Sequence, residues 1–179
     1  MALKATIFKA ELHIADMDRH YYEQHSLTIA QHPSETDERL MVRLLAFAMY
    51  ADQALEFGKG ISEDEPALWK KDLTGAVDLW IVVGQPMDKI LLKACGVAKQ
   101  VVLLLYGSQT DIWWENNREA LGNKANLMIL QLPYKETQAM AAMAKRNMEV
   151  TCNIEGGHIM LMSADGTVNI EPVRLRTAD

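Results

Sequence analysis

Asp78 is the residue of this chain whose surroundings most clearly suggest chemistry. It lies in a continuous apolar segment, residues 77–86, which is rich in β-branched side chains and closes with Gly84 and Pro86. An apolar segment of this length without alternation indicates a strand that is covered on both faces. Aspartate is disfavoured in strands and is rarely buried without a partner. We therefore expect Asp78 to hold a cation, a metal ion or a hydrogen-bond network.

Four more side chains are candidates for the same chemistry. Asp64 and Glu65 belong to an acidic loop, Glu38 lies near the expected start of a helix, and Gln85 follows the apolar strand. Carboxylates from separate segments can together hold Mg²⁺, which lowers the pKa of a bound water and stabilises charge on a phosphate. Each candidate also has a plainer explanation: a carboxylate paired with a cation, a solvated loop, a favourable interaction with a helix dipole, or a helix cap.

Hydrophobic periodicity predicts the first elements that must position these groups. Alternation over residues 3–15 and 21–30 indicates an N-terminal β-hairpin, with a phase slip near Lys9 that suggests a bulge. A capping-box pattern that begins at Ser34 predicts a helix running to about Gln53.

Two apolar strands, residues 77–83 and 100–106, flank a helix that we expect to begin near Pro86. A strand, a short helix and a second buried strand form a βαβ unit, so the two strands should be parallel. The remaining expected elements are a helix ending near Gly122, a strand at 126–132, a helix at 135–147, and a C-terminal β-meander at 149–154, 158–163 and 168–173.

No internal repeat or linker interrupts this order, so we predict a single domain spanning residues 1–179. Its class is α/β with antiparallel additions (mixed α+β): a mixed sheet flanked by helices, with the N-terminal β-hairpin and the C-terminal β-meander attached.

Composition limits the classes of function. The 179 residues include 18 basic and 24 acidic side chains, for a net charge of −6, so nucleic acid as a partner is not supported by net charge. The two cysteines lack zinc-site spacing, no segment is long enough to span a membrane, and phosphate-binding glycine motifs are absent. We expect a cytoplasmic protein with reduced thiols and no organic cofactor; the sequence does not indicate an oligomeric state.

Several segments together resemble one family. They are LKATIFKA at the start, HPSETDERLMVRLLAFA (32–48), LEFGKGISEDEPALW (55–69), VDLWIVVGQP (77–86), KACG (93–96) and the tryptophan pair at 113–114. Across essentially its whole length the chain resembles the YaeQ family of bacterial proteins. The resemblance implies a fold similar to the PD-(D/E)xK nuclease core, the α-β-β-β-α-β arrangement of restriction endonucleases and DNA-repair nucleases. It implies a reaction only by analogy.

The chain departs from the nuclease pattern at the lysine. In that pattern an acid and a lysine two residues apart on one strand point to the same face. Two residues after Asp78 the chain has Trp80. Members of the family often carry a second acid at the position of Val82, and two residues after that position lies Gly84. Neither register gives an acid followed by the lysine.

Glutamine replaces the lysine in some nucleases of this fold, which makes Gln85 a candidate. It lies seven residues after Asp78, roughly 23 Å along a straight strand, so the two cannot bind one ion. Gln85 would have to work with Asp64 or Glu65, and Glu38 would be the additional acid on the preceding helix. Lys59, Arg39 and Arg43 are candidates for a displaced base.

Two functions therefore remain open. The first is a Mg²⁺-dependent phosphodiesterase acting on nucleic acid through a variant site, with Asp78, Asp64, Gln85 and Glu38 catalytic and Asp78, Asp64 and Glu65 holding the metal. The second is a non-catalytic binding or regulatory module on the same scaffold.

Overall fold

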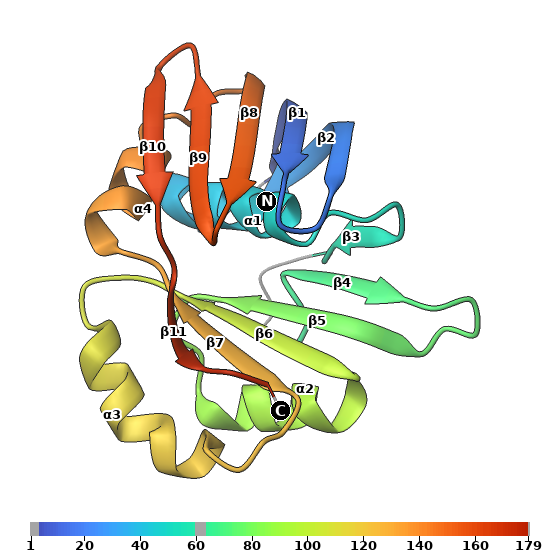
Figure 1. Ribbon diagram of the computed structural model, residues 1–179, viewed down its shortest axis with the longest axis vertical. Helices are drawn as coiled ribbons and strands as arrows, with labels where there is room; N and C mark the ends of the chain where they lie inside the picture. The colour runs from blue at the N-terminus through green and yellow to red at the C-terminus, as the bar shows by residue number, and fades with distance from the viewer. Residues whose placement is uncertain (1–3, 60–63, 179) are drawn as a thin grey trace. The chain divides into compact units, whose positions relative to one another are not determined.

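The computed structural model describes residues 4–59 and 64–178. Within these residues the chain is mixed α+β, with two mixed β-sheets and four helices (Figure 1). Part of the expected acidic loop, Ser62 and Glu63, lies outside the described residues. Among the described residues, no helix combines the length and the apolarity needed to cross a membrane.

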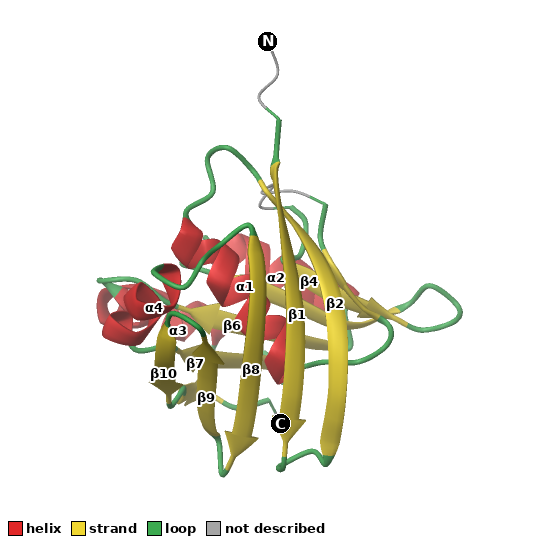
Figure 2. Cartoon of the chain, turned by 90° about the horizontal axis from the view of Figure 1, so that it is seen from above, coloured by secondary structure: helices red, strands yellow, loops and turns green. Residues whose placement is uncertain are grey.

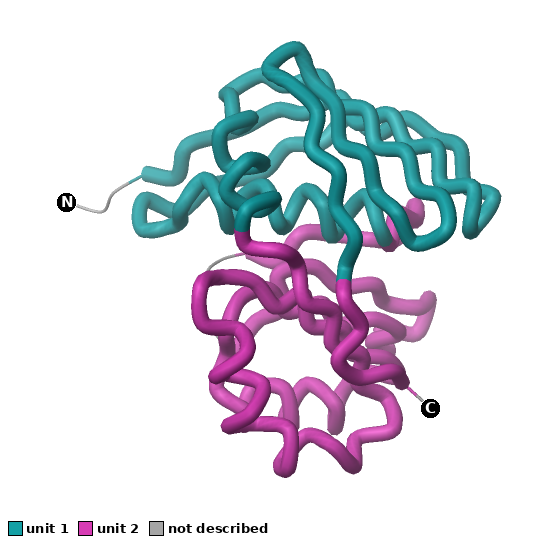
Figure 3. The backbone as a smooth tube through the Cα atoms, turned by 60° about the vertical axis from the view of Figure 1, so that its left-hand side comes forward, with its two compact units in different colours: residues 1–49, 135–172 teal, residues 50–134, 173–179 magenta. Residues whose placement is uncertain are grey.

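The chain forms two compact units (Figure 3). Unit 1 comprises residues 1–49 and 135–172, and unit 2 comprises residues 50–134 and 173–179. Each unit is built from two separate stretches of sequence, so neither corresponds to a simple N- or C-terminal half. The expectation of a single domain stays a prediction.

Unit 1 contains a five-stranded sheet that unites the predicted hairpin with the predicted meander (Figure 2). β1 pairs with β2 in the antiparallel sense and with β8 in the parallel sense. In spatial order the strands are β10 (Gly166–Ile170), β9 (His158–Ser163), β8 (Asn147–Glu155), β1 (Thr6–Asp16) and β2 (Tyr21–Gln31). The hairpin and the meander are confirmed, whereas the parallel pairing that joins them was not predicted.

The bulge expected near Lys9 is wrong. The β1–β2 register runs without interruption from Thr6 to Asp16. The residues of β1 that face the core are Phe8, Ala10, Leu12 and Ile14, all in one phase. Ile7 produced the apparent phase slip, because it is apolar yet lies on the outer face, where it is 42% exposed.

Two helices complete unit 1: α1 (Asp37–Met49), which contacts β1, and α4 (Tyr134–Ala141). Thr36 caps α1, because its Oγ1 accepts a hydrogen bond from the Arg39 N–H at 3.1 Å. Ser34, the expected cap, bonds His32 instead. Both helices end earlier than predicted, and α1 is buried all round from Leu40 to Ala48. A helix buried all round lacks the one-sided apolar stripe of a surface helix, so its bounds are harder to predict from periodicity.

Unit 2 contains a six-stranded sheet whose centre is the predicted βαβ unit. β5, β6 and β7 are parallel, and the outer strands join them in the antiparallel sense. In spatial order the strands are β11 (Val173–Arg176), β7 (Leu127–Gln131), β6 (Gln100–Leu105), β5 (Val77–Val83), β4 (Leu68–Lys71) and β3 (Leu55–Phe57). β4 and β11 were not predicted, because both are short and carry basic side chains.

Helices α2 (Asp88–Val97) and α3 (Thr110–Leu121) lie on one face of this sheet (Figure 1). The cluster beneath them includes Trp80 from β5, Leu103 from β6 and Leu91 from α2. β6 is buried on both faces from Val101 to Leu105, as its unbroken apolar sequence predicted.

Two aspartates organise the turn between β1 and β2. Asp16, which is 2% exposed, accepts hydrogen bonds from the Arg19 backbone and guanidinium. Asp18 accepts the N–H groups of Gly156 at 2.7 Å and Gly157 at 2.9 Å. These bonds, that of Gly157 first, hold the pKa of Asp18 below its usual range. Asp18 therefore fixes the tip of the β8–β9 hairpin to the β1–β2 turn.

Replacing Asp18 by asparagine should lower the melting temperature at neutral pH, because the amide offers one oxygen acceptor where the carboxylate offers two. The folded-state pKa is lowered, so this contribution is present above the ordinary aspartate pKa of about 4 and is lost as pH falls through the folded value. Melting curves at pH 7 and near pH 3 should show the difference from wild type shrinking in acid. Glu155→Gln, an exposed change in the same hairpin, is the control. An equal difference at both pH values would contradict a charge-dependent clamp.

Candidate functional site

Asp78 lies at the start of β5 and is held by a lysine. Its Oδ1 is 2.7 Å from Nζ of Lys99, and the same ammonium lies 3.7 Å from Oδ2 of Asp72. The Asp78 side chain is 30% exposed, so the pair sits at the margin of the sheet. Lys99 thus lies between two carboxylates. Of the roles expected for Asp78, the structure displays pairing with a cation.

The strand register produces this contact. In the parallel pairing of β5 and β6, Leu79 lies opposite Gln100, and the Lys99 N–H donates to the Val77 carbonyl at 3.0 Å. The hydrogen bond and the negative charge of Asp78 raise the pKa of Lys99. A hydrogen bond from Thr74 is the largest cause that lowers the pKa of Asp72. Both shifts favour the charged forms of Lys99 and Asp72.

The position where a nuclease lysine would follow Asp78 is part of the core. Trp80 is 7% exposed and meets the Trp69 ring edge-to-face, with 6.0 Å between the ring centroids. Among residues 4–59 and 64–178, its Nε1 has no hydrogen-bond partner. Val82, at the position where the family resemblance implied a second acid, packs against the same hydrophobic cluster. This face of β5 is therefore occupied by packing.

Gln85 lies at the opposite end of β5 from Asp78 and joins two strand ends. Its Nε2 donates to the Tyr106 carbonyl at 3.0 Å. Gly107 has a φ of +118°, and a Cβ at this position would lie 2.6 Å from Nε2 of Gln85. The amide therefore packs directly on the Gly107 backbone. In this structure Gln85 ties the end of β5 to the loop after β6.

The acids of the loop before β4 point to solvent. Asp64 is 76% exposed, and its Oδ1 lies 3.4 Å from Nζ of Lys93 on α2. Glu65 is exposed as well. Exposed ion pairs of this kind contribute little to stability, typically below about 1 kcal/mol.

Glu38 belongs to unit 1, where it connects α1 to α4. It accepts hydrogen bonds from Oγ1 of Thr137 at 3.2 Å and from the Gln138 amide. Two of the proposed bases, Arg39 and Arg43, both bond the buried Glu35 in the same unit. Lys59, the third, is exposed. Glu38, Arg39 and Arg43 therefore hold α1 within unit 1.

The acids that we expected to share a metal ion do not form one ligand set. Asp78 pairs with Lys99, directly before β6, whereas Asp64 pairs with Lys93 on α2. In the part of the chain that the structure describes, no group of three or more His, Cys, Asp or Glu side chains is close enough to hold a metal ion. The described residues therefore do not fit a Mg²⁺ centre of the nuclease type.

Thiol chemistry has no support either. Cys95 and Cys152 are free, and burial raises the pKa of the Cys152 thiol to about 12. A thiolate nucleophile needs a lowered pKa and access to solvent. Cys152 has the opposite environment.

The sequence reading missed Lys99, although a signal for it was present. Once residues 77–83 and 100–106 are assigned to neighbouring parallel strands, their starting ends lie side by side. Lys99 then falls next to Asp78. The Lys93–Asp64 pair carries no such signal, because it depends on the path of a loop.

Comparisons with known proteins agree on one family. Residues 1–172 match the family described as "YaeQ protein". A protein of Escherichia coli (strain K12) described as "Uncharacterized protein YaeQ" is 42% identical over 173 residues, covering 96% of this chain and 94% of that protein. The Salmonella typhi protein of the same description is 40% identical, with 96% of both chains covered.

Solved structures agree with this match. The crystal structure of a YaeQ protein from Xanthomonas axonopodis pv. citri is 47% identical in sequence and has a TM-score of 0.94. The match covers 98% of this chain and 99% of that chain. The YaeQ protein of Pseudomonas syringae is 36% identical, with a TM-score of 0.93 and 97% coverage of both chains. The expected membership is confirmed: this chain belongs to the YaeQ family.

Proposed function

We propose that this chain is a non-catalytic binding or regulatory module on a nuclease-like scaffold. The observation that carries the proposal is the Asp78–Lys99 pair, in which the ammonium lies 2.7 Å from Oδ1 of the carboxylate that we expected to bind a metal ion. The order α1, β3, β4, β5, α2, β6 along the chain supports the scaffold, because it repeats the α-β-β-β-α-β order of the nuclease core.

Three further observations argue against cutting. Trp80 and Val82 occupy the positions that would complete a nuclease site after Asp78, and both pack in the hydrophobic cluster. Gln85, the substitute for the lysine, is at the other end of β5 and engaged with Tyr106. The net charge of −6 gives no long-range attraction to a phosphate backbone. A module that recognises another molecule without a metal needs neither an acid-x-lysine pair nor a long-range attraction to phosphate.

Thermal unfolding with and without Mg²⁺ or Mn²⁺ tests the proposal. A specific site with metal at a hundredfold excess over its Kd would stabilise the protein by about 3 kcal/mol. We expect no such shift for the wild type, and the same response from Asp78→Asn and Asp64→Asn. Single- and double-stranded DNA and RNA incubated with the metal-supplemented protein should remain intact. Metal-dependent cleavage that Asp78→Asn abolishes would overturn the proposal in favour of the phosphodiesterase.

Replacing Trp80 by lysine restores the acid-x-lysine spacing and provides a second test. Because position 80 is in the core, we expect a loss of at least about 3 kcal/mol of unfolding free energy and no gain of cleavage. Trp80→Phe is the matched control. It should cost under about 2 kcal/mol, since it removes an indole N–H that has no partner among the described residues. Urea unfolding measures both, and a stable, cleaving Trp80→Lys variant would contradict the assignment of this face to packing.

A further inference from the structure

β8 is longer than the strand that covers its outer edge. On one side, β8 pairs with β1 from Asn147 to Ile154. On the other side, its pairing with β9 begins only at Thr151, opposite Met162. β9 ends at Ser163, and the chain turns into β10. Residues 147–150 of β8 therefore have a strand neighbour on one side only.

The backbone groups of Asn147 and Glu149 point toward the uncovered side. The Arg146 carbonyl faces β1, because it accepts the Lys9 N–H at 2.8 Å. Successive residues of a strand direct their N–H and C=O groups to alternate sides. Asn147 and Glu149 thus present their groups where β9 would continue. Such an edge is a template for another strand.

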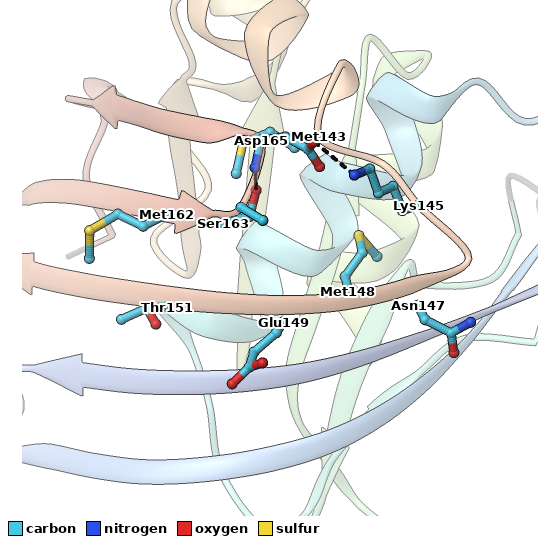
Figure 4. A pocket seen from close by; sticks show the side chains of 10 residues that line it. Met143, Lys145, Asn147, Met148, Glu149, Thr151, Met162, Ser163 and Asp165 are labelled. Atoms are coloured by element: carbon cyan, nitrogen blue, oxygen red, sulfur yellow. Dashed lines mark hydrogen bonds and ion pairs between the residues drawn. The ribbon is translucent and has the colours of Figure 1, made fainter.

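A pocket of about 470 Å³ occupies this position (Figure 4). Its lining draws on both faces of the sheet. Asn147, Glu149 and Thr151 project from one side of β8, and Met148 projects from the other. A pocket can reach both faces only where a strand is missing, so it is a gap in the sheet and not a depression on its surface.

The walls of the gap supply an apolar floor and a closed end. Met143 and Met148, which are 4% and 7% exposed, line it on the core side. Methionine adapts its shape to different apolar partners. At the far end, Nζ of Lys145 lies 2.8 Å from Oδ1 of Asp165, and the Asp165 N–H donates to Oγ of Ser163. This ion pair neutralises both of its charges.

The outer rim carries a negative charge. The Glu149 side chain is 80% exposed, with Oε1 3.4 Å from Nε2 of His13. Glu11 is its direct neighbour on β1. Hydrogen bonds from Ser26 and Gln24 lower the pKa of Glu11, which keeps this carboxylate charged. Lys9 lies two pairs further along, opposite Asn147. A cation at the rim would therefore meet Glu149 first.

We propose that this gap binds an extended peptide segment of a partner protein as an added strand, with the pattern apolar–basic–apolar. A peptide residue opposite Glu149 faces the outer rim, where a lysine or arginine pairs with that carboxylate. The residues before and after it face the core side, where Met143 and Met148 receive apolar side chains. The open stretch of four residues, 147–150, spans roughly 10 Å, enough for three or four peptide residues.

This inference goes beyond the proposed function. It concerns unit 1 alone and would hold whether or not unit 2 bound a metal ion, so the two proposals fail independently.

The test uses the full chain and an acetylated, amidated peptide of sequence Thr-Leu-Lys-Leu-Thr, followed by NMR. We expect saturable shifts of the Asn147 and Glu149 amides and of the Met143 and Met148 methyl groups. A peptide with an N-methylated lysine backbone should bind about tenfold more weakly, because it loses one strand hydrogen bond. Thr-Leu-Glu-Leu-Thr should also bind more weakly.

Glu149→Lys should reverse this preference, so that the glutamate peptide binds better than the lysine peptide. Glu119→Lys, an equal charge change at an exposed position of α3, should leave it unchanged. Absence of saturable shifts at Asn147 and Glu149, or equal binding of the N-methylated peptide, would overturn the proposal. Shifts of the same amides that grow with protein concentration in the absence of peptide would assign the gap to a second copy of this chain, and would overturn it as well.

Discussion

The parallel register of β5 and β6 determines what the polar residues of unit 2 can do. Because Leu79 lies opposite Gln100, the starting ends of the two strands bring Asp78 to Lys99, and their finishing ends bring Gln85 to Tyr106. A shift of one residue would separate both pairs and would also turn every side chain of the shifted strand to the other face of the sheet. The same constraint that builds the core thus assigns each of these side chains a partner within the fold, at opposite ends of β5.

In unit 1 the corresponding constraint is the parallel pairing of β1 with β8. It joins a hairpin from the start of the chain to a meander from its end. β1 supports β8 along nearly its whole length, so β8 keeps its strand conformation even where β9 has ended. An edge held rigid in this way is prepared to pair with another strand, since little conformational entropy is left to lose. The clamp of Asp18 on Gly156 and Gly157 fixes the opposite end of the same strand.

The sequence predicted elements with strong local signals and failed where long-range pairing decides. The range 77–83 was exact, and the βαβ unit followed from two unbroken apolar strands around a short helix. The short strand β4 and the β1–β8 pairing were missed, because no periodicity records which strands become neighbours. For the site, the family resemblance pointed to particular residues, and whether they carry a function stays a prediction. Their partners depended on register and loop path, which is why Asp64, Asp78 and Glu38 proved to be held separately.

The face of β5 that carries Asp78, Trp80 and Val82 shows why packing and metal binding exclude each other at these positions. A carboxylate at position 82 would lie against the hydrophobic cluster that receives Val82, and it would need a cation to offset its desolvation. Valine removes that need and adds apolar contact. Trp80 likewise adds apolar contact, because it is buried at a position from which a lysine would have to reach solvent. Once both positions contribute to the core, Asp78 is the one charge left on this face, and a single lysine at the next strand's start is sufficient to balance it.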